Sequence, residues 1–168
     1  MKAIAVIALL VVTLAGCTTP SPNPEPEDTM VDYQDARTEL VELLDRLQAV
    51  VPGEWAETEF GARSCSLPDG AQGARSGFQR LGPGAAAGTE REVADAMIAV
   101  LAEAGFEATS SEDPIDGGLV IRGTYPPSGG DDGELAIQFG VSPNGSTLDS
   151  MSRCAPGDAD EINEQRQD

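Results

Sequence analysis

The chain has 168 residues, with 29 Asp and Glu against 10 Lys and Arg, so its formal net charge at pH 7 is −19. This charge argues against nucleic-acid binding, because such binding depends on cationic side chains that meet phosphates. The chain contains no histidine, which excludes Ser-His-Asp and Cys-His catalysis and every histidine metal ligand. We therefore expect no metal site, no cofactor and no nucleic-acid partner.

The N-terminal segment has the layout of a secretory signal, with Lys2 before an unbroken apolar run from Ala3 to Val12. This run is too short for a transmembrane helix, which needs about 20 apolar residues. An ordinary secretory signal is a second alternative, but it is cut after a small-x-small pattern. The segment Leu14-Ala15-Gly16-Cys17 resembles the lipobox of bacterial lipoproteins. That resemblance implies that residues 1–16 are a cleaved signal peptide. It also implies that Cys17 carries a diacylglyceryl anchor on the outward face of the cell membrane.

Residues 17–31 differ in composition from the signal, since Pro20, Pro22, Pro24 and Pro26 alternate with small or acidic residues. A segment without apolar side chains to bury does not fold alone, so we expect an extended tether of roughly 35 Å. A proline-rich run can also be a ligand for a recognition domain. Residues 32–155 have the length of a single domain, and residues 156–168 are predicted to be a polar, frayed C-terminal tail.

Two amphipathic helices are predicted within the domain. In the first, over residues 32–50, apolar residues from Tyr33 to Leu47 recur on one face, and Pro52-Gly53 ends the pattern. The second begins at Thr89 and Glu92, which are spaced as a capping box. It ends at Gly105, which is placed as a left-handed cap.

The rest of the domain is predicted to be a β-sheet. Residues 54–67 are expected to be extended, and residues 106–110 to form a short strand. Residues 119–125 and 134–141 alternate between apolar and polar side chains, and Asn144-Gly145 indicates a hairpin into a third strand that ends at Cys154. The predicted fold is α+β: two helices packed on one face of an antiparallel β meander of three to five strands, a two-layer sandwich with one disulfide.

Two cysteines remain beside Cys17, namely Cys65 and Cys154. An even pair in an exported chain predicts a disulfide. A metal site is the alternative, but two thiolates without histidine do not complete a zinc tetrahedron. We therefore expect Cys65 and Cys154 to be bonded and to tie the early part of the domain to its last strand.

Four segments resemble the LppA-like lipoproteins of actinobacteria: Val51-Pro-Gly-Glu-Trp55, Arg63-Ser-Cys-Ser66, Ala102-Glu-Ala-Gly-Phe106 and Ser152-Arg-Cys154. The resemblance covers roughly residues 40–154. It implies an exported α+β lipoprotein domain with one disulfide, and it brings no catalytic residue with it.

The longest part of the domain without a predicted element is residues 68–88, which we expect to be a loop with Arg75, Phe78 and Arg80 as candidate binding residues. Three functions are compatible with the sequence. The favoured one is a non-catalytic domain that binds an envelope protein or a small ligand. The second is an accessory subunit that acts through a membrane protein partner. The third is an envelope hydrolase with a carboxylate pair; we expect that the protein is not an enzyme.

Overall fold

The computed structural model describes residues 32–127 and 133–166, so the predicted signal peptide, Cys17 and the tether lie outside the described residues. The elements in chain order are α1 (Tyr33–Gln48), β1 (Ala56–Ser66), β2 (Gln72–Gly82), α2 (Glu90–Glu103), β3 (Thr109–Ile115), β4 (Gly118–Tyr125), β5 (Ala136–Ser142), β6 (Gly145–Met151), β7 (Ala155–Pro156) and α3 (Ala159–Gln165). No described helix is long and apolar enough to cross a membrane.

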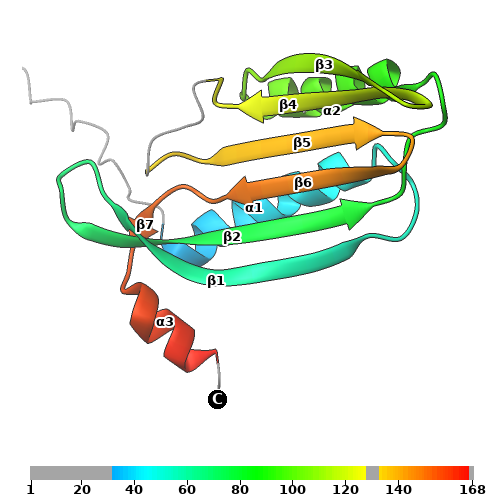
Figure 1. The fold of residues 1–168 in the computed structure, drawn as a ribbon. Helices are drawn as coiled ribbons and strands as arrows, with labels where there is room; N and C mark the ends of the chain where they lie inside the picture. Colours follow the sequence, from blue (N-terminus) through cyan, green and yellow to red (C-terminus); the bar gives the residue numbers. More distant parts are fainter. Residues whose placement is uncertain (1–31, 128–132, 167–168) are drawn as a thin grey trace, which may run out of the picture.

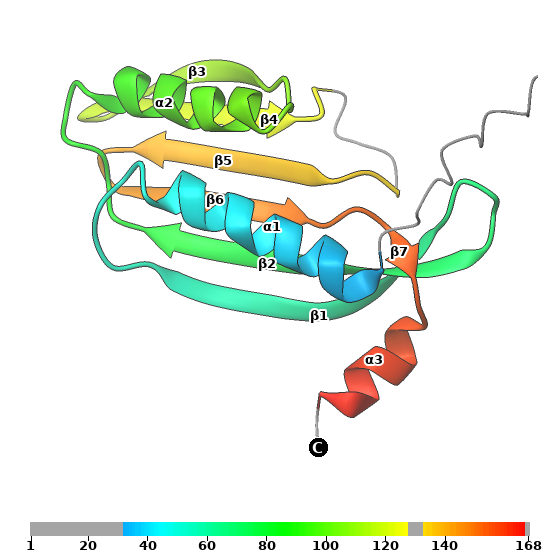
Figure 2. The same ribbon diagram turned by 180° about the vertical axis from the view of Figure 1, so that it is seen from behind.

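The strands form one seven-stranded sheet in which every pair is antiparallel. The strand order is β1-β2-β6-β5-β4-β3, and β7 adds a short pairing to β2. Helix α1 lies over β2 and β6, and α2 lies over β4 and β5, so both helices cover the same face of the sheet (Figure 2). The predicted two-layer α+β class is confirmed.

The core lies between the helices and this covered face of the sheet. Leu40, Leu44 and Leu47 of α1 are fully buried, as the helical spacing predicted, and they join side chains from both helices and four strands in one cluster. Helix α2 ends as predicted: Gly105 has φ +86°, and the Phe106 amide donates to the Leu101 carbonyl at 2.9 Å.

Strand β2 occupies the region in which a loop was predicted, so the prediction for residues 68–88 is wrong and the strand count exceeds three to five. Its small residues have packing reasons. A Cβ at Gly77 would lie 2.7 Å from the Met151 sulfur, and a Cβ at Gly82 would lie 2.3 Å from the Trp55 ring. The glycines therefore let neighbouring side chains cross β2, and they hide the β pattern of the strand.

Two local predictions at chain turns are corrected. The side chain of Thr89 does not cap α2, so the capping box is absent; its hydroxyl instead donates to the Ala86 carbonyl at 2.8 Å. The hairpin between β5 and β6 exists, but its two loop residues are Pro143 and Asn144, since Ser142 pairs with Gly145.

The predicted frayed tail is also wrong, since its first part belongs to the fold. Strand β7 pairs with β2, and α3 packs beside β1. Asn163 of α3 holds the outer edge of β1: its Oδ1 accepts from the Ala62 amide at 2.8 Å, and its Nδ2 donates to the Ala62 carbonyl at 2.9 Å. A side-chain amide thus satisfies backbone groups that an edge strand would otherwise leave open.

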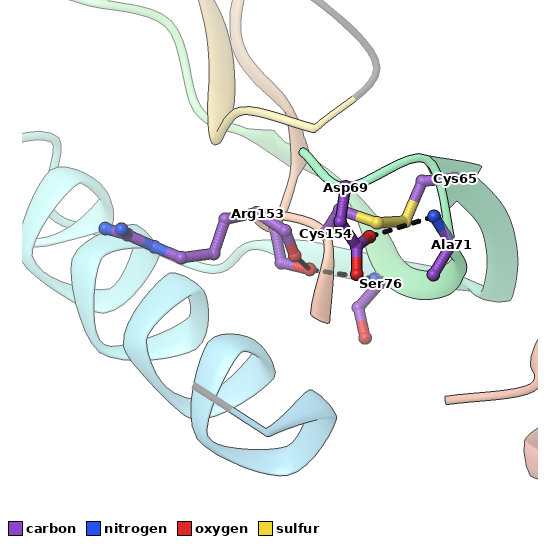
Figure 3. The surroundings of a disulfide bond; sticks show 7 residues. Cys65, Asp69, Ala71, Ser76, Arg153 and Cys154 are labelled. Carbon is purple, nitrogen blue, oxygen red and sulfur yellow. Dashed lines mark hydrogen bonds between the residues drawn. A yellow bond between two sulfur atoms is a disulfide. The ribbon is translucent and has the colours of Figure 1, made fainter. Parts of the chain in front are cut away.

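The predicted disulfide is confirmed, since Cys65 of β1 is bonded to Cys154, just before β7, across 89 positions of sequence (Figure 3). The strand between them, β2, passes the bond at Gly73, where a Cβ would lie 2.7 Å from the Cys154 sulfur. The neighbouring Arg153 extends away from the bond toward α1 and donates to Glu39 at 2.7 Å. The bond and this contact fasten the end of β6 to both layers.

Candidate functional site

The predicted binding residues do not form a surface. Arg75, Phe78 and Arg80 all lie on β2, where Phe78 and Arg80 face α1 with only 1% and 4% of their surface exposed. Arg75 lies three positions before Phe78 and five before Arg80, and because strand side chains alternate between faces, these odd separations place it on the opposite face, partly buried. The prediction of a binding loop at these three residues is therefore wrong.

Arg80 instead pairs with acidic side chains of α1 and β1 between the two layers. Its Nε donates to Glu57 Oε2 at 2.6 Å, and its Nη1 donates to Asp45 Oδ1 at 2.7 Å and to Gln48 Oε1 at 3.0 Å. Burying a guanidinium is costly unless its charge is paired and its donors are satisfied. These contacts meet that condition, so Arg80 has a structural role.

A second ion-pair cluster lies beside it, around Glu59 of β1. Arg37 binds the Glu59 carboxylate through two hydrogen bonds of 3.0 Å, and Arg166 reaches the same carboxylate at 2.8 Å. The hydrogen bonds from Arg37 lower the pKa of Glu59, with a further lowering from Arg166, and they outweigh the opposing effect of burial. The same contacts raise the pKa of Arg37, whose guanidinium lies 5.3 Å from the centre of the Phe78 ring.

The other face of the sheet carries no described helix (Figure 1). On this uncovered face the strand register brings six polar side chains into one line that crosses six strands. We call this line the polar row; its members, in spatial order, are Thr58, Gln79, Asp149, Gln138, Thr124 and Thr109. All six are at least partly exposed. Gln79 and Asp149 are joined by a hydrogen bond of 2.8 Å.

A hollow of about 370 Å³ lies beside the polar row, over β4, β5 and β6. Gly140 lines the hollow, and it pairs with Thr147 and Arg122 in the register line next to the row. A Cβ at Gly140 would lie 2.8 Å from the Thr147 hydroxyl, so the glycine gives room to that side chain at the edge of the hollow. The polar side chains around the hollow are Arg122, Thr124, Gln138, Ser142, Thr147 and Asp149.

The uncovered face also carries an exposed aromatic ring. Phe60 of β1 is 46% exposed. Its ring lies near Gly77 and Met151 on this face, and the Arg63 guanidinium lies 5.6 Å from its centre. The face therefore combines a polar row, a hollow and one apolar platform.

Charge is nearly balanced around the hollow. Arg122 forms an ion pair with Asp113 of the neighbouring strand β3. Asp149 accepts the hydrogen bond from Gln79. The hollow therefore has one cation and one carboxylate, each with a partner, in a chain whose net charge is −19.

No metal-ligand cluster and no pair of buried carboxylates accompanies this face among the described residues. The described residues contain no cluster of three or more metal-ligating side chains. Glu90, the buried carboxylate at the start of α2, lies at 2% exposure on the covered side near Gly118 and Pro143. Among the described residues no second buried carboxylate accompanies Glu90.

No protein-family model and no curated protein matches this sequence. Among solved structures, the fold is similar to the crystal structure of a DUF4853 family protein from Actinomyces odontolyticus ATCC 17982. The identity is 18% and the TM-score is 0.48, and the match covers 84% of this chain and 78% of that chain.

Proposed function

We propose that this protein is a lipid-anchored domain on the outward face of the cell membrane, where its uncovered sheet face binds a small polar ligand of the envelope. It acts by binding and carries out no turnover. The hollow beside the polar row is the observation that carries this proposal. Ligand sites are concave surfaces of about 300–1,000 Å³ with a few convergent polar groups, and the hollow lies within that range.

The position of the hollow also supports a binding role. A sheet with one face packed on helices usually turns a polar face to solvent. Such a face does not need a hollow between its side chains. Gly140 lines the hollow between Thr147 and Arg122, and a glycine within a strand can mark a place where a ligand approaches the backbone closely.

The anchor is tested by changing Cys17 to Ala in the organism's own envelope, with Ser21→Ala in the tether as the matched control. We expect the Cys17 variant to lose metabolic acyl label and to leave the membrane fraction in an alkaline wash, whereas the control keeps both. If the Cys17 variant still carries label and stays with the membrane, the lipid anchor is refuted.

The binding face is tested by adding a small-molecule extract of the envelope to ¹⁵N-labelled protein and mapping the amide shifts. We expect the largest shifts at Gln138, Gly140 and Thr147. Shifts confined to the helices, or none at all, would contradict the proposed face. Consumption of an extract component with release of a product would contradict the proposal that the protein only binds.

A further inference from the structure

We propose that the uncovered face binds a neutral, hydroxyl-rich chain, an oligosaccharide, which lies along the polar row and places one substituent in the hollow at Gly140. This inference rests on the proposed function and names the ligand class for the same face.

The first argument is the hydrogen-bonding chemistry of the polar row. Five of its six members are Thr or Gln, and each hydroxyl or amide can both donate and accept. A sugar hydroxyl has the same dual capacity. A polyanion would instead require a set of donors, and an aliphatic ligand would require an apolar lining.

The second argument is charge. The one carboxylate of the polar row, Asp149, already accepts a hydrogen bond from Gln79. The one cation at the hollow, Arg122, is already paired with Asp113. An anionic ligand would meet the repulsion of a chain of charge −19. A neutral ligand does not meet this repulsion, and it leaves both pairs in place.

The third argument is shape. Neighbouring strands are about 4.8 Å apart, so a row across six strands extends for about 24 Å, the length of a short oligosaccharide. A peptide that adds to a sheet uses the open edge of a strand, whereas these groups lie in the middle of a face. Near the β1 end of the row, Phe60 offers an exposed ring on which the apolar face of a sugar can stack.

The experiment measures binding to the full chain by isothermal titration calorimetry, in a zwitterionic detergent because alkyl glycoside detergents would compete. The probes are cellohexaose, maltohexaose and mannohexaose as neutral chains, hexagalacturonate as an anionic chain, and the peptide (Gly-Ser)₃. We expect at least one neutral hexasaccharide to bind with Kd below the millimolar range, and the other two probe types to bind at least tenfold more weakly.

Two variants locate the site. Changing Gln138 to Ala and Thr124 to Val together removes two members of the row whose side chains are exposed or half-buried, so the fold is retained. We expect this pair to weaken the hexasaccharide at least tenfold. Gly140→Val fills the hollow and should weaken it similarly. The control is Glu92→Gln, an exposed residue on α2 in the other layer, which should leave binding unchanged.

Preferred binding of hexagalacturonate or of the peptide would overturn the inference, and so would hexasaccharide binding that the row variants leave unaltered. The failure of every hexasaccharide, while the envelope extract still shifts the amides of the row, overturns the ligand class and leaves the proposed function standing. An extract that shifts no amide of this face refutes the proposed function itself.

Discussion

Removing the disulfide gives the sharpest test of how the fold is stabilised. The bond joins residues separated by 89 positions, so it restricts the unfolded chain over most of the domain. In the chain-entropy description, closing a loop of this length contributes about 4.6 kcal/mol at 25 °C. For a domain of about 135 residues, this corresponds to a loss of about 16 °C in Tm.

The assay compares the oxidised protein, the reduced protein and the Cys65→Ser/Cys154→Ser variant in guanidinium titrations. Trp55 is the one tryptophan of the chain and precedes β1, at the end of the strand away from Cys65, so its fluorescence reports loss of the whole sheet. We expect the reduced protein and the double variant to coincide, both below the oxidised protein by several kcal/mol. A difference under about 1 kcal/mol, or a transition seen at β7 and α3 alone, would refute the reasoning.

Three further predictions follow from contacts in the covered layer and at the sheet edge. Gly123→Ala should destabilise the protein by about 3 kcal/mol in chemical unfolding, because its Cβ would lie 2.0 Å from the Phe139 ring; a neutral result would contradict the packing. Glu59→Gln should cost about 1–2 kcal/mol at pH 7. Because the folded pKa of Glu59 is lowered by its hydrogen bonds with Arg37, this stability is present above the unfolded pKa and is lost as pH falls through the folded pKa, so the two proteins should converge in acid. Asn163→Leu leaves the edge of β1 uncovered and should produce concentration-dependent association in light scattering; a monomer at all concentrations would show that the edge needs no cover.

The elements that sequence predicted are those whose pattern is local. The leucines of α1 recur every three or four positions, and Gly105 follows the last of the apolar residues on α2, so both helices and one cap follow from spacing alone. The disulfide followed from there being one pair of cysteines beside Cys17. In these cases the physical cause acts within a few residues or has no competing partner.

The elements that sequence missed depend on partners far along the chain. In the sequence, strand β2 resembles a glycine-rich loop. Gly73 and Gly77 are glycines because a Cβ at either would collide with the side chain of Cys154 or Met151, and these residues lie more than 70 positions later. The alternation of buried Ala74, Ser76, Phe78 and Arg80 was present in the sequence, but the small residues and the buried arginine concealed it. The polar row is even harder to predict from the sequence, because its six residues form no local motif and come together only through the register of six strands.

The order of the strands has a consequence for how this protein is made. The β1–β2 hairpin lies early in the chain, but the other strand that pairs with β2 along its length is β6. Gly77 of β2 therefore cannot pair with Met151 until β6 has been synthesised. The strands β3 to β6 form a run of neighbours that can pair in order as they emerge from the ribosome. Until β6 has been synthesised, the apolar face of α1 can pack against β2 but lacks its contacts with β6. Synthesis therefore first gives two incomplete parts of the sheet, β1–β2 and β3–β5, and β6 joins them late in the synthesis of the chain, before β7 pairs with β2.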